Sequence, residues 1–189
     1  MDRNEVQMVG RNLWNIYKCP SDALKAACKD LEECYWDAFI RHFGSKLRGV
    51  SRRELDGATD LFIRDVNNAE MPPLLERLQS KGVRLAICSD NTEFWFRRQM
   101  SKLGLYRFFK REDCILSFDT GVSKASPGLE LFRKVSDTLG IEKESCLFVD
   151  DMERNIDLLS EHGFTAILFP SHSVHGARFL DTLLSRMHL

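Results

Sequence analysis

The sequence predicts an α/β fold in which a doubly wound parallel sheet follows an N-terminal helical region. Two observations support this prediction. From residue 71 onward the chain repeats a cycle of amphipathic helix, glycine and short apolar strand, whereas no strand pattern stands out before it. Short apolar runs separated by helices pair in parallel through right-handed crossovers. We therefore expect a helical, cap-like region over residues 1–70 and an α/β core over residues 71–189.

The helical region is predicted from spacing and from one capping signal. Apolar residues recur at helical spacing between residues 23 and 39. Ser51-Arg52-Arg53-Glu54 has the pattern of a capping box, in which a serine and a glutamate satisfy each other's backbone N–H groups at the start of a helix. This region is expected to pack as a cap beside the sheet.

The core is predicted element by element from apolar runs and capping residues. The expected strands are residues 83–88, 114–118, 146–149 and 165–169. The helices between them are marked in chain order by Pro72 and Gly82, Thr92 and Gly104, Ser126-Pro127 and Gly140, and by Gly163 after the helix that contains Ile156. A last helix is expected through residues 179–184.

The amino-acid composition limits the kinds of molecule that the protein is expected to bind. With 27 basic and 28 acidic side chains the net charge is -1, so no overall field favours nucleic acid or an anionic membrane, and a small ligand is the expected partner. No segment approaches the roughly 20 apolar residues that span a bilayer, which predicts a cytoplasmic protein. The six cysteines show no zinc-ligand spacing and are expected to be reduced thiols. Nothing in the sequence fixes an oligomeric state.

Polar residues follow three of the predicted strands. Ser89-Asp90 follows the first, Lys124 comes after the second, and Asp150-Asp151 follows the third. Ligands bind outside the carboxyl ends of parallel strands, where loops and helix N-termini converge. We therefore expect these residues to gather around one pocket at one rim of the sheet.

The adjacent carboxylates Asp150 and Asp151 are the strongest of these signals. Two unit charges about 4 Å apart interact by roughly 4 kcal/mol at an effective dielectric near 20, and Mg²⁺ removes that repulsion while using only one or two carboxylates. The alternative is that one aspartate caps the next helix and the other faces solvent. Taken alone, Lys124 is more typical of a solvated surface charge, and Ser89 alone fits a helix cap.

Residues from about 72 to 170 resemble the Rossmann-like core of the haloacid dehalogenase (HAD) superfamily, which contains mostly Mg²⁺-dependent phosphatases with an aspartyl-phosphate intermediate. Residues 85–91 resemble its second motif, which implies phosphate binding by Ser89 with Asp90. Residues 121–132 resemble its third motif, which implies that Lys124 is the catalytic, phosphate-binding lysine. Residues 147–156 resemble its fourth, which implies that Asp150 and Asp151 are Mg²⁺ ligands and that Asn155 supports them.

The sequence departs from the family pattern in two places. Ala125 and Ser126 replace the usual proline and aspartate beside the lysine. The first motif, D-x-D-G-T, which supplies the nucleophile and the general acid/base at the end of the central strand, is absent. A sheet without that strand is expected to expose apolar edges. Three explanations stay open: a late start or truncation, a replacement strand over Val6 to Gly10, or a pseudoenzyme with a rearranged sheet.

The resemblance implies a hydrolase: a Mg²⁺-dependent phosphatase by descent, acting on a small phosphorylated metabolite. Because the nucleophilic aspartate is not visible, activity is expected to be absent or crippled in this chain. The alternative is a non-catalytic pseudoenzyme that binds a phosphate ligand or a protein.

Overall fold

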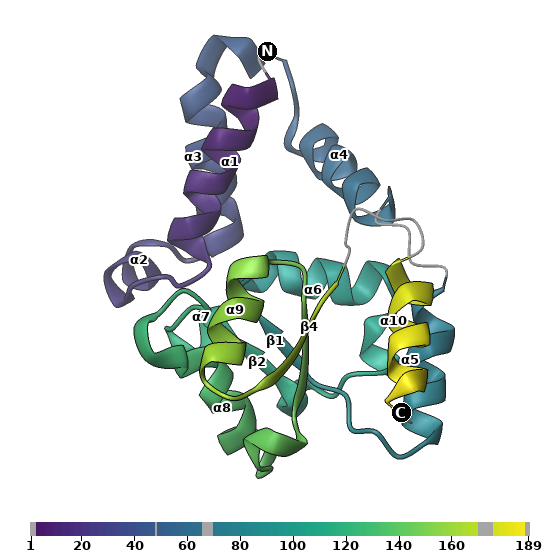
Figure 1. The fold of residues 1–189 in the computed structure, drawn as a ribbon. Coiled ribbons are helices and arrows are strands. Elements are labelled where there is room, and N and C mark those ends of the chain that lie inside the picture. The colour runs from purple at the N-terminus through teal and green to yellow at the C-terminus, as the bar shows by residue number, and fades with distance from the viewer. Residues whose placement is uncertain (1–2, 48, 66–69, 170–175, 188–189) are drawn as a thin grey trace. The chain divides into compact units, whose positions relative to one another are not determined.

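Helices alone occupy the described part of the first 65 residues, and helices alternate with short strands after residue 70 (Figure 1). The computed structural model describes residues 3–47, 49–65, 70–169 and 176–187. The N-terminal helices are α1 (Arg3–Tyr17), α2 (Asp22–Ala27), α3 (Leu31–Phe43) and α4 (Arg52–Asp65). The later helices are α5 (Met71–Ser80), α6 (Glu93–Lys102), α7 (Ser117–Thr120), α8 (Glu130–Leu139), α9 (Glu153–Glu161) and α10 (Gly176–Arg186). None of these helices is both long and apolar enough to cross a bilayer.

The strands form two pairs in the described part of the chain. β1 (Ile87–Ser89) pairs with β2 (Cys114–Leu116), and β3 (Leu147–Asp150) pairs with β4 (Thr165–Leu168). The second pair is parallel, with Leu147 opposite Thr165 and Asp150 opposite Leu168. The predicted α/β class with a helical N-terminal region is confirmed. All four expected strands are present, although β1 covers only the end of the predicted run 83–88.

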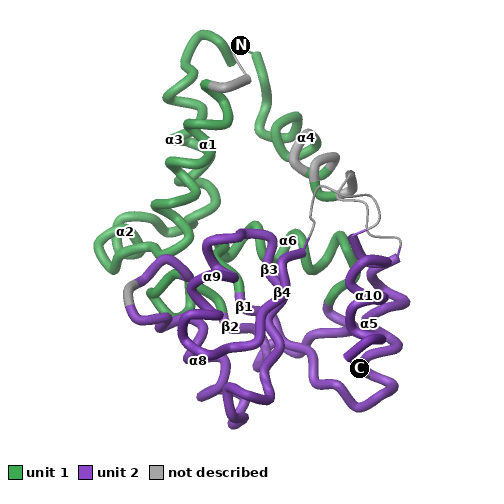
Figure 2. The backbone as a smooth tube through the Cα atoms, viewed as in Figure 1, with its two compact units in different colours: residues 1–65, 89–105, 116–123 green, residues 66–88, 106–115, 124–189 purple. Residues whose placement is uncertain are grey.

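The chain divides into two units, each built from several segments (Figure 2). Unit 1 contains residues 1–65, 89–105 and 116–123, and unit 2 contains residues 66–88, 106–115 and 124–189. The domain boundary at residue 70 stays a prediction.

Each unit has its own apolar core. In unit 1, α1, α3 and the 3₁₀ turn Gly44–Leu47 pack through buried aromatic and aliphatic side chains, which are Val9, Tyr17, Tyr35, Trp36, Phe39, Phe43 and Leu47. In unit 2, α5 packs against α10 through Leu74, Leu78, Leu180 and Leu184. A second group in unit 2 stacks Phe148 of β3 edge-on between Phe132 and Phe164, with ring centroids 5.4 and 5.5 Å apart. This aromatic stack fixes β3 against α8, so the carboxyl end of β3 has a rigid support.

Several helix ends follow the predicted capping chemistry. The backbone N–H of Ser51 donates to Glu54 Oε2 over 2.7 Å, and the N–H of Glu54 donates back to Ser51 Oγ over 3.3 Å, which confirms the capping box at α4. Thr92 caps α6 by accepting from the N–H of Trp95. Gly140 ends α8 in the left-handed conformation that glycine adopts without a Cβ penalty.

One of the open explanations and two expectations are wrong. Val6 to Gly10 lies inside α1, so it is not a replacement strand. The helix expected from Ser126-Pro127 begins only at Glu130, because Gly128 and Leu129 have positive φ angles of 77° and 61° that end a short 3₁₀ turn first.

The prediction of six reduced thiols is also wrong at two positions. Cys28 and Cys34 form a disulfide, since the short turn between α2 and α3 brings their Cα atoms to 6.2 Å. The other four cysteines, Cys19, Cys88, Cys114 and Cys146, are not part of a disulfide.

Candidate functional site

Asp150 is a buried carboxylate at the carboxyl end of β3, with only 4% of its side chain exposed. Its Oδ2 accepts a 2.5 Å hydrogen bond from Lys124 Nζ. Its Oδ1 accepts from the backbone N–H of Met152 and from Asn155 Nδ2, each over 2.9 Å. Asn155 is buried in the first turn of α9, so the support expected from it is a direct hydrogen bond. The Asp150 carboxylate is therefore directed into the protein, toward the Lys124 ammonium.

The surroundings of Asp150 keep it ionised. Burial alone would raise the pKa of this carboxyl group, but the charge and hydrogen bond of Lys124 outweigh burial, with help from Met152 and Asn155. The pKa is consequently held below its ordinary value. A negative carboxylate and a positive ammonium thus form a fixed ion pair at neutral pH.

Lys124 begins the segment of unit 2 that follows α7, and its side chain is 17% exposed. Its Nζ also lies 5.8 Å from the centroid of the Phe132 ring in α8, within cation–π range. A lysine that meets a buried carboxylate and an aromatic face is not a solvated surface charge. The structure therefore does not support the alternative that Lys124 is a free surface charge.

Asp151 follows β3 directly and is exposed. Its exposure agrees with the alternative that one aspartate of the pair faces solvent, yet Asp150 is not a simple helix cap, because Lys124 holds its second oxygen. Within residues 3–47, 49–65, 70–169 and 176–187 no group of three or more His, Cys, Asp and Glu side chains is placed to hold a metal.

A Mg²⁺ site still fits the chemistry of this pair. Both lone pairs of Asp150 Oδ1 are used by donors, whereas Oδ2 accepts one hydrogen bond from Lys124 and keeps a lone pair. Mg²⁺ binds through one or two carboxylates and completes its shell with water and substrate phosphate. Asp150 Oδ2 and the exposed Asp151 carboxylate match that donor set. Their assignment as Mg²⁺ ligands stays a prediction.

Ser89 and Asp90 lie in unit 1, at the end of β1. The Asp90 carboxylate accepts a 3.2 Å ion-pair hydrogen bond from Lys18 Nζ, and both side chains are nearly buried, at 12% and 13% exposed. Lys18 Nζ also lies 4.6 Å from the centroid of the Trp14 ring. Lys18 therefore neutralises Asp90, which removes a charge that would repel a phosphate bound at Ser89.

The loop after Ser89 is fixed by its own hydrogen bonds. The N–H of Asn91 donates to Ser117 Oγ over 3.0 Å, and the N–H of Thr92 donates to Asn91 Oδ1 over 2.9 Å. Ser117, which is fully buried, also donates to the backbone carbonyl of Lys18 over 2.8 Å. The backbone N–H groups of Asn91 and Thr92 are therefore engaged within the protein. Among the described residues, the Ser89 hydroxyl makes one long contact of 3.4 Å, to the carbonyl of Asp90.

Cys19 adjoins this network. Burial raises the pKa of its thiol and the Asp90 carboxylate adds to the effect, against the opposing hydrogen bond from Ser117 and the charge of Lys18. The group is consequently a thiol at neutral pH and not a thiolate nucleophile.

The structure thus joins Lys124 to Asp150 in unit 2 and joins Asp90 to Lys18 in unit 1. Sequence reasoning missed Lys18 and Ser117. Lys18 belongs to a helical region without a recognisable motif, and Ser117 lies inside a run that was assigned to a strand. No local signal marks either residue, since both act through partners more than 70 residues away or in another element.

Comparison with known proteins gives two findings. A family model described as haloacid dehalogenase-like hydrolase matches residues 9–163. A phosphoglycolate phosphatase from Aquifex aeolicus (strain VF5) is 34% identical over 182 residues, which cover 87% of this chain and 83% of that protein. Both matches include the segments that contain Ser89, Lys124 and Asp150, and the family match also includes the N-terminal helices from residue 9.

Proposed function

Since the chain belongs to the haloacid dehalogenase-like hydrolases, we propose that it is a Mg²⁺-dependent phosphatase of a small phosphorylated metabolite. The observation that carries the proposal is the buried ion pair of Lys124 with Asp150 at the carboxyl end of β3. A carboxylate held below its ordinary pKa beside a fixed ammonium supplies both a metal ligand and a positive charge for phosphate oxygens. The phosphoglycolate phosphatase relative supports a phosphate monoester as the substrate.

The reaction breaks the P–O bond to the leaving alcohol and forms a P–O bond to an oxygen that comes from water. In this proposal the Lys124 ammonium offsets charge on the phosphoryl group. The 2.5 Å hydrogen bond to Asp150 supports this role, because it keeps the ammonium oriented. Asp150 and Asp151 would hold Mg²⁺, which when bound neutralises phosphate charge. Ser89 and Asp90 are proposed as further phosphate-binding residues, with Lys18 balancing the Asp90 charge.

The nucleophile is the unassigned part of this proposal. The sequence contains no D-x-D-G-T motif, and the Cys19 thiol is protonated at neutral pH. In serine proteases, loss of the covalent nucleophile lowers turnover on the order of 10⁶-fold. Measurable turnover by this chain would therefore show that another carboxylate serves, or that water attacks directly.

The test is hydrolysis of p-nitrophenyl phosphate and 2-phosphoglycolate, with Mg²⁺ and with EDTA. Because no nucleophilic aspartate is assigned, we expect at most weak Mg²⁺-dependent turnover, and Asp150→Asn should abolish whatever turnover is measured. Asp157→Asn is the matched control, because Asp157 is an exposed aspartate of α9 in the same unit, and it should leave turnover unchanged. Thermal unfolding of each variant checks that the fold persists.

Two results would count against the proposal. Turnover that is indifferent to Asp150→Asn would place the chemistry elsewhere. No turnover, together with no shift of the melting temperature by Mg²⁺ or phosphate, would remove the phosphoryl site altogether. Saturable phosphate binding without turnover would instead favour the non-catalytic alternative.

A further inference from the structure

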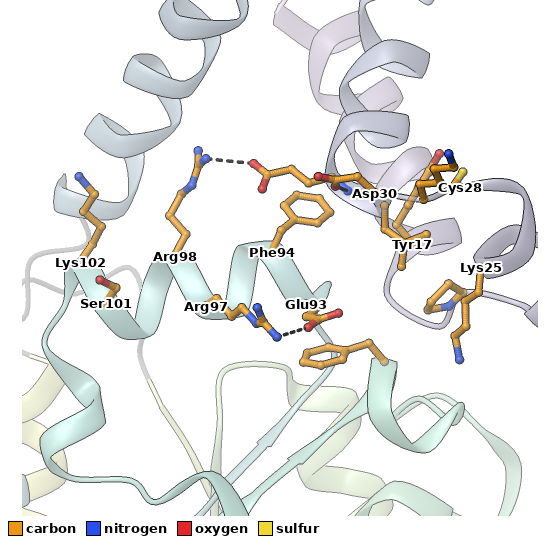
Figure 3. Close-up of a pocket in the computed structure, with 15 residues that line it drawn as sticks. Tyr17, Lys25, Cys28, Asp30, Glu93, Phe94, Arg97, Arg98, Ser101 and Lys102 are labelled. Atoms are coloured by element: carbon orange, nitrogen blue, oxygen red, sulfur yellow. Dashed lines mark hydrogen bonds and ion pairs between the residues drawn. The ribbon is translucent and has the colours of Figure 1, made fainter.

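The Cys28–Cys34 disulfide lies in the wall of a cleft of about 750 Å³ in unit 1 (Figure 3). Cys28 follows α2 directly and lines the cleft, and all the other lining residues also belong to unit 1. Cys34 lies in α3, where its side chain packs against the apolar core of unit 1. The disulfide therefore connects the part of the cleft wall that follows α2 to this core.

The residues of α2 give the helix little packing of its own. The helix is six residues long, and none of these residues is buried. Leu24 is partly buried against the core of unit 1, and the N-cap Ser21 accepts a hydrogen bond from the N–H of Leu24 over 3.2 Å. Because isolated helices shorter than about 12–15 residues are marginal in water, a helix as short as α2 depends on its anchors. The disulfide at its C-cap, Cys28, is a covalent anchor.

Helix α3, at the other end of the disulfide, has anchors that do not depend on it. Its N-cap Asp30 accepts hydrogen bonds from the N–H groups of Glu32 and Glu33 over 2.8 and 3.1 Å. The helix contains 13 residues and buries four aromatic side chains, which are Tyr35, Trp36, Phe39 and Phe43. Buried aromatic rings and a formed cap stabilise a helix whether or not the disulfide is closed. Breaking the disulfide should therefore loosen α2 and leave α3 in place.

Helix α6 also lines the cleft and is likewise held without the disulfide. Phe96 and Met100 bury one side of this helix. On the side of the cleft, Arg98 of α6 pairs with Glu32 of α3 over 3.0 Å, as Figure 3 shows. The part of the cleft that depends on the disulfide is therefore the wall formed by α2 and the turn after it.

A thiol reductant can reach this disulfide. Both cysteines are half-buried, and Cys28 lines the cleft, so a dithiol can approach the Cys28 sulfur from solvent. The first thiolate of the dithiol bonds to Cys28 Sγ, which breaks the S–S bond and releases Cys34 as a thiolate. The second thiolate bonds to the first sulfur of the dithiol, which releases Cys28 and closes the reductant to a disulfide. Two electrons pass to the protein, and the two protons of the dithiol end on the two cysteines.

We propose that Cys28 and Cys34 form a redox switch that sets the shape of this cleft. In the oxidised chain the disulfide holds α2 and the turn after it in the cleft wall. In the chain reduced by a dithiol, α2 loosens while α3 and α6 keep their positions. The cysteines are six residues apart, so the cross-link restrains the unfolded chain less than one over a long loop and acts locally. The switch is independent of the proposed phosphatase function, because neither cysteine takes part in that chemistry.

The test is hydrogen–deuterium exchange of the full chain, read by mass spectrometry after incubation with oxidised or with reduced dithiothreitol. Alkylation of the unfolded chain first counts the thiols, which should rise from four to six on reduction. The reporter amides are those of Lys25 and Cys28, whose N–H groups donate to carbonyls one turn earlier. Their exchange should become at least about tenfold faster on reduction, because the open form of the turn is no longer cross-linked. Residues 35–43 of α3 and 94–102 of α6 should exchange equally in both states.

Two variants separate the switch from other effects of the reductant. Cys28→Ser with Cys34→Ser should show the fast α2 exchange with and without reduced dithiothreitol. Cys88→Ser is the control, because Cys88 is a half-buried cysteine outside the disulfide, and this variant should keep the full response. Exchange of the α8 amides, in unit 2, should be the same in all these proteins and shows that the fold persists.

Three results would overturn the proposal. One is equal exchange of α2 in the oxidised and reduced parent chain. Another is an acceleration of α3 as large as that of α2, which would mean that the disulfide supports the whole unit and not one wall of the cleft. The third is six free thiols after incubation with oxidised dithiothreitol, since the switch would then have no oxidised state.

Discussion

Replacing Lys124 by methionine tests whether the buried ion pair organises the end of β3. Methionine keeps much of the length of lysine but has no charge, so Asp150 would keep its hydrogen bonds from Met152 and Asn155 and lose its cation. Breaking a buried pair by removing one partner costs about 3–5 kcal/mol. Because two donors remain and Lys124 is 17% exposed, we expect the lower end, a loss of about 3 kcal/mol in the free energy of unfolding at pH 7.

The loss should depend on pH in a defined direction. The folded-state pKa of Asp150 is below its ordinary value, so its stabilising contribution is present above the unfolded carboxyl pKa of about 3.9 and disappears as the pH falls through the folded value. In Lys124→Met the cation is gone, so burial raises the Asp150 pKa and the ionised carboxylate becomes destabilising. The stability difference between the two proteins should therefore be largest at neutral pH and shrink as the pH falls to 4 and below.

Urea unfolding followed by circular dichroism at pH 7 and pH 4 measures this difference. Lys134→Met is the matched control, because Lys134 is an exposed lysine of α8 in unit 2, and its replacement should change stability by less than about 0.5 kcal/mol. A Lys124→Met protein as stable as the control at pH 7 would refute the reasoning, as would a stability loss that grows at low pH.

Two local features make further predictions. Ser51→Ala removes the hydroxyl of the capping box at α4 and should cost about 1 kcal/mol in urea unfolding, whereas Ser160→Ala, at an exposed position of α9, should cost almost nothing; similar losses would contradict the capping assignment. Cys28→Ser should lower the free energy of unfolding by about 2 kcal/mol, which is the chain-entropy value for a loop of six residues. Dithiothreitol should abolish the difference from the parent protein, and a difference that persists would mean that the cross-link is not its cause.

Sequence reasoning succeeded where a structure depends on neighbours along the chain. The capping box at Ser51 and the cap at Thr92 are formed by groups within three residues, so the amino-acid types were sufficient to place them. The end of α8 at Gly140 follows equally from local backbone preference. Short apolar runs between turn signals located the strands, because such runs are typical of sheet strands.

Sequence reasoning failed where the local structure depends on residues that are distant in the sequence or on an alternative backbone conformation. Proline after a serine favours a helix start at Ser126-Pro127, but the positive φ angles of Gly128 and Leu129 end the 3₁₀ turn that begins there. Leu129 adopts this unusual backbone conformation while its side chain is completely buried. The partner of Asp90 lies 72 residues away, at Lys18. Of the motif residues Ser89, Lys124 and Asp150, the structure joins the last two, whereas the approach of Ser89 to them stays a prediction.

The absence of the first motif affects both the sheet, which lacks its central strand, and the chemistry, which lacks its nucleophile. In a parallel sheet covered on both faces, apolar strand residues are buried, yet Val149 of β3 is 41% exposed and Leu168 of β4 is 44% exposed. These exposures, and the separation of the described strands into two pairs, agree with the expectation that a sheet without its central strand exposes apolar surface. The motif would have supplied an apolar strand and a carboxylate together.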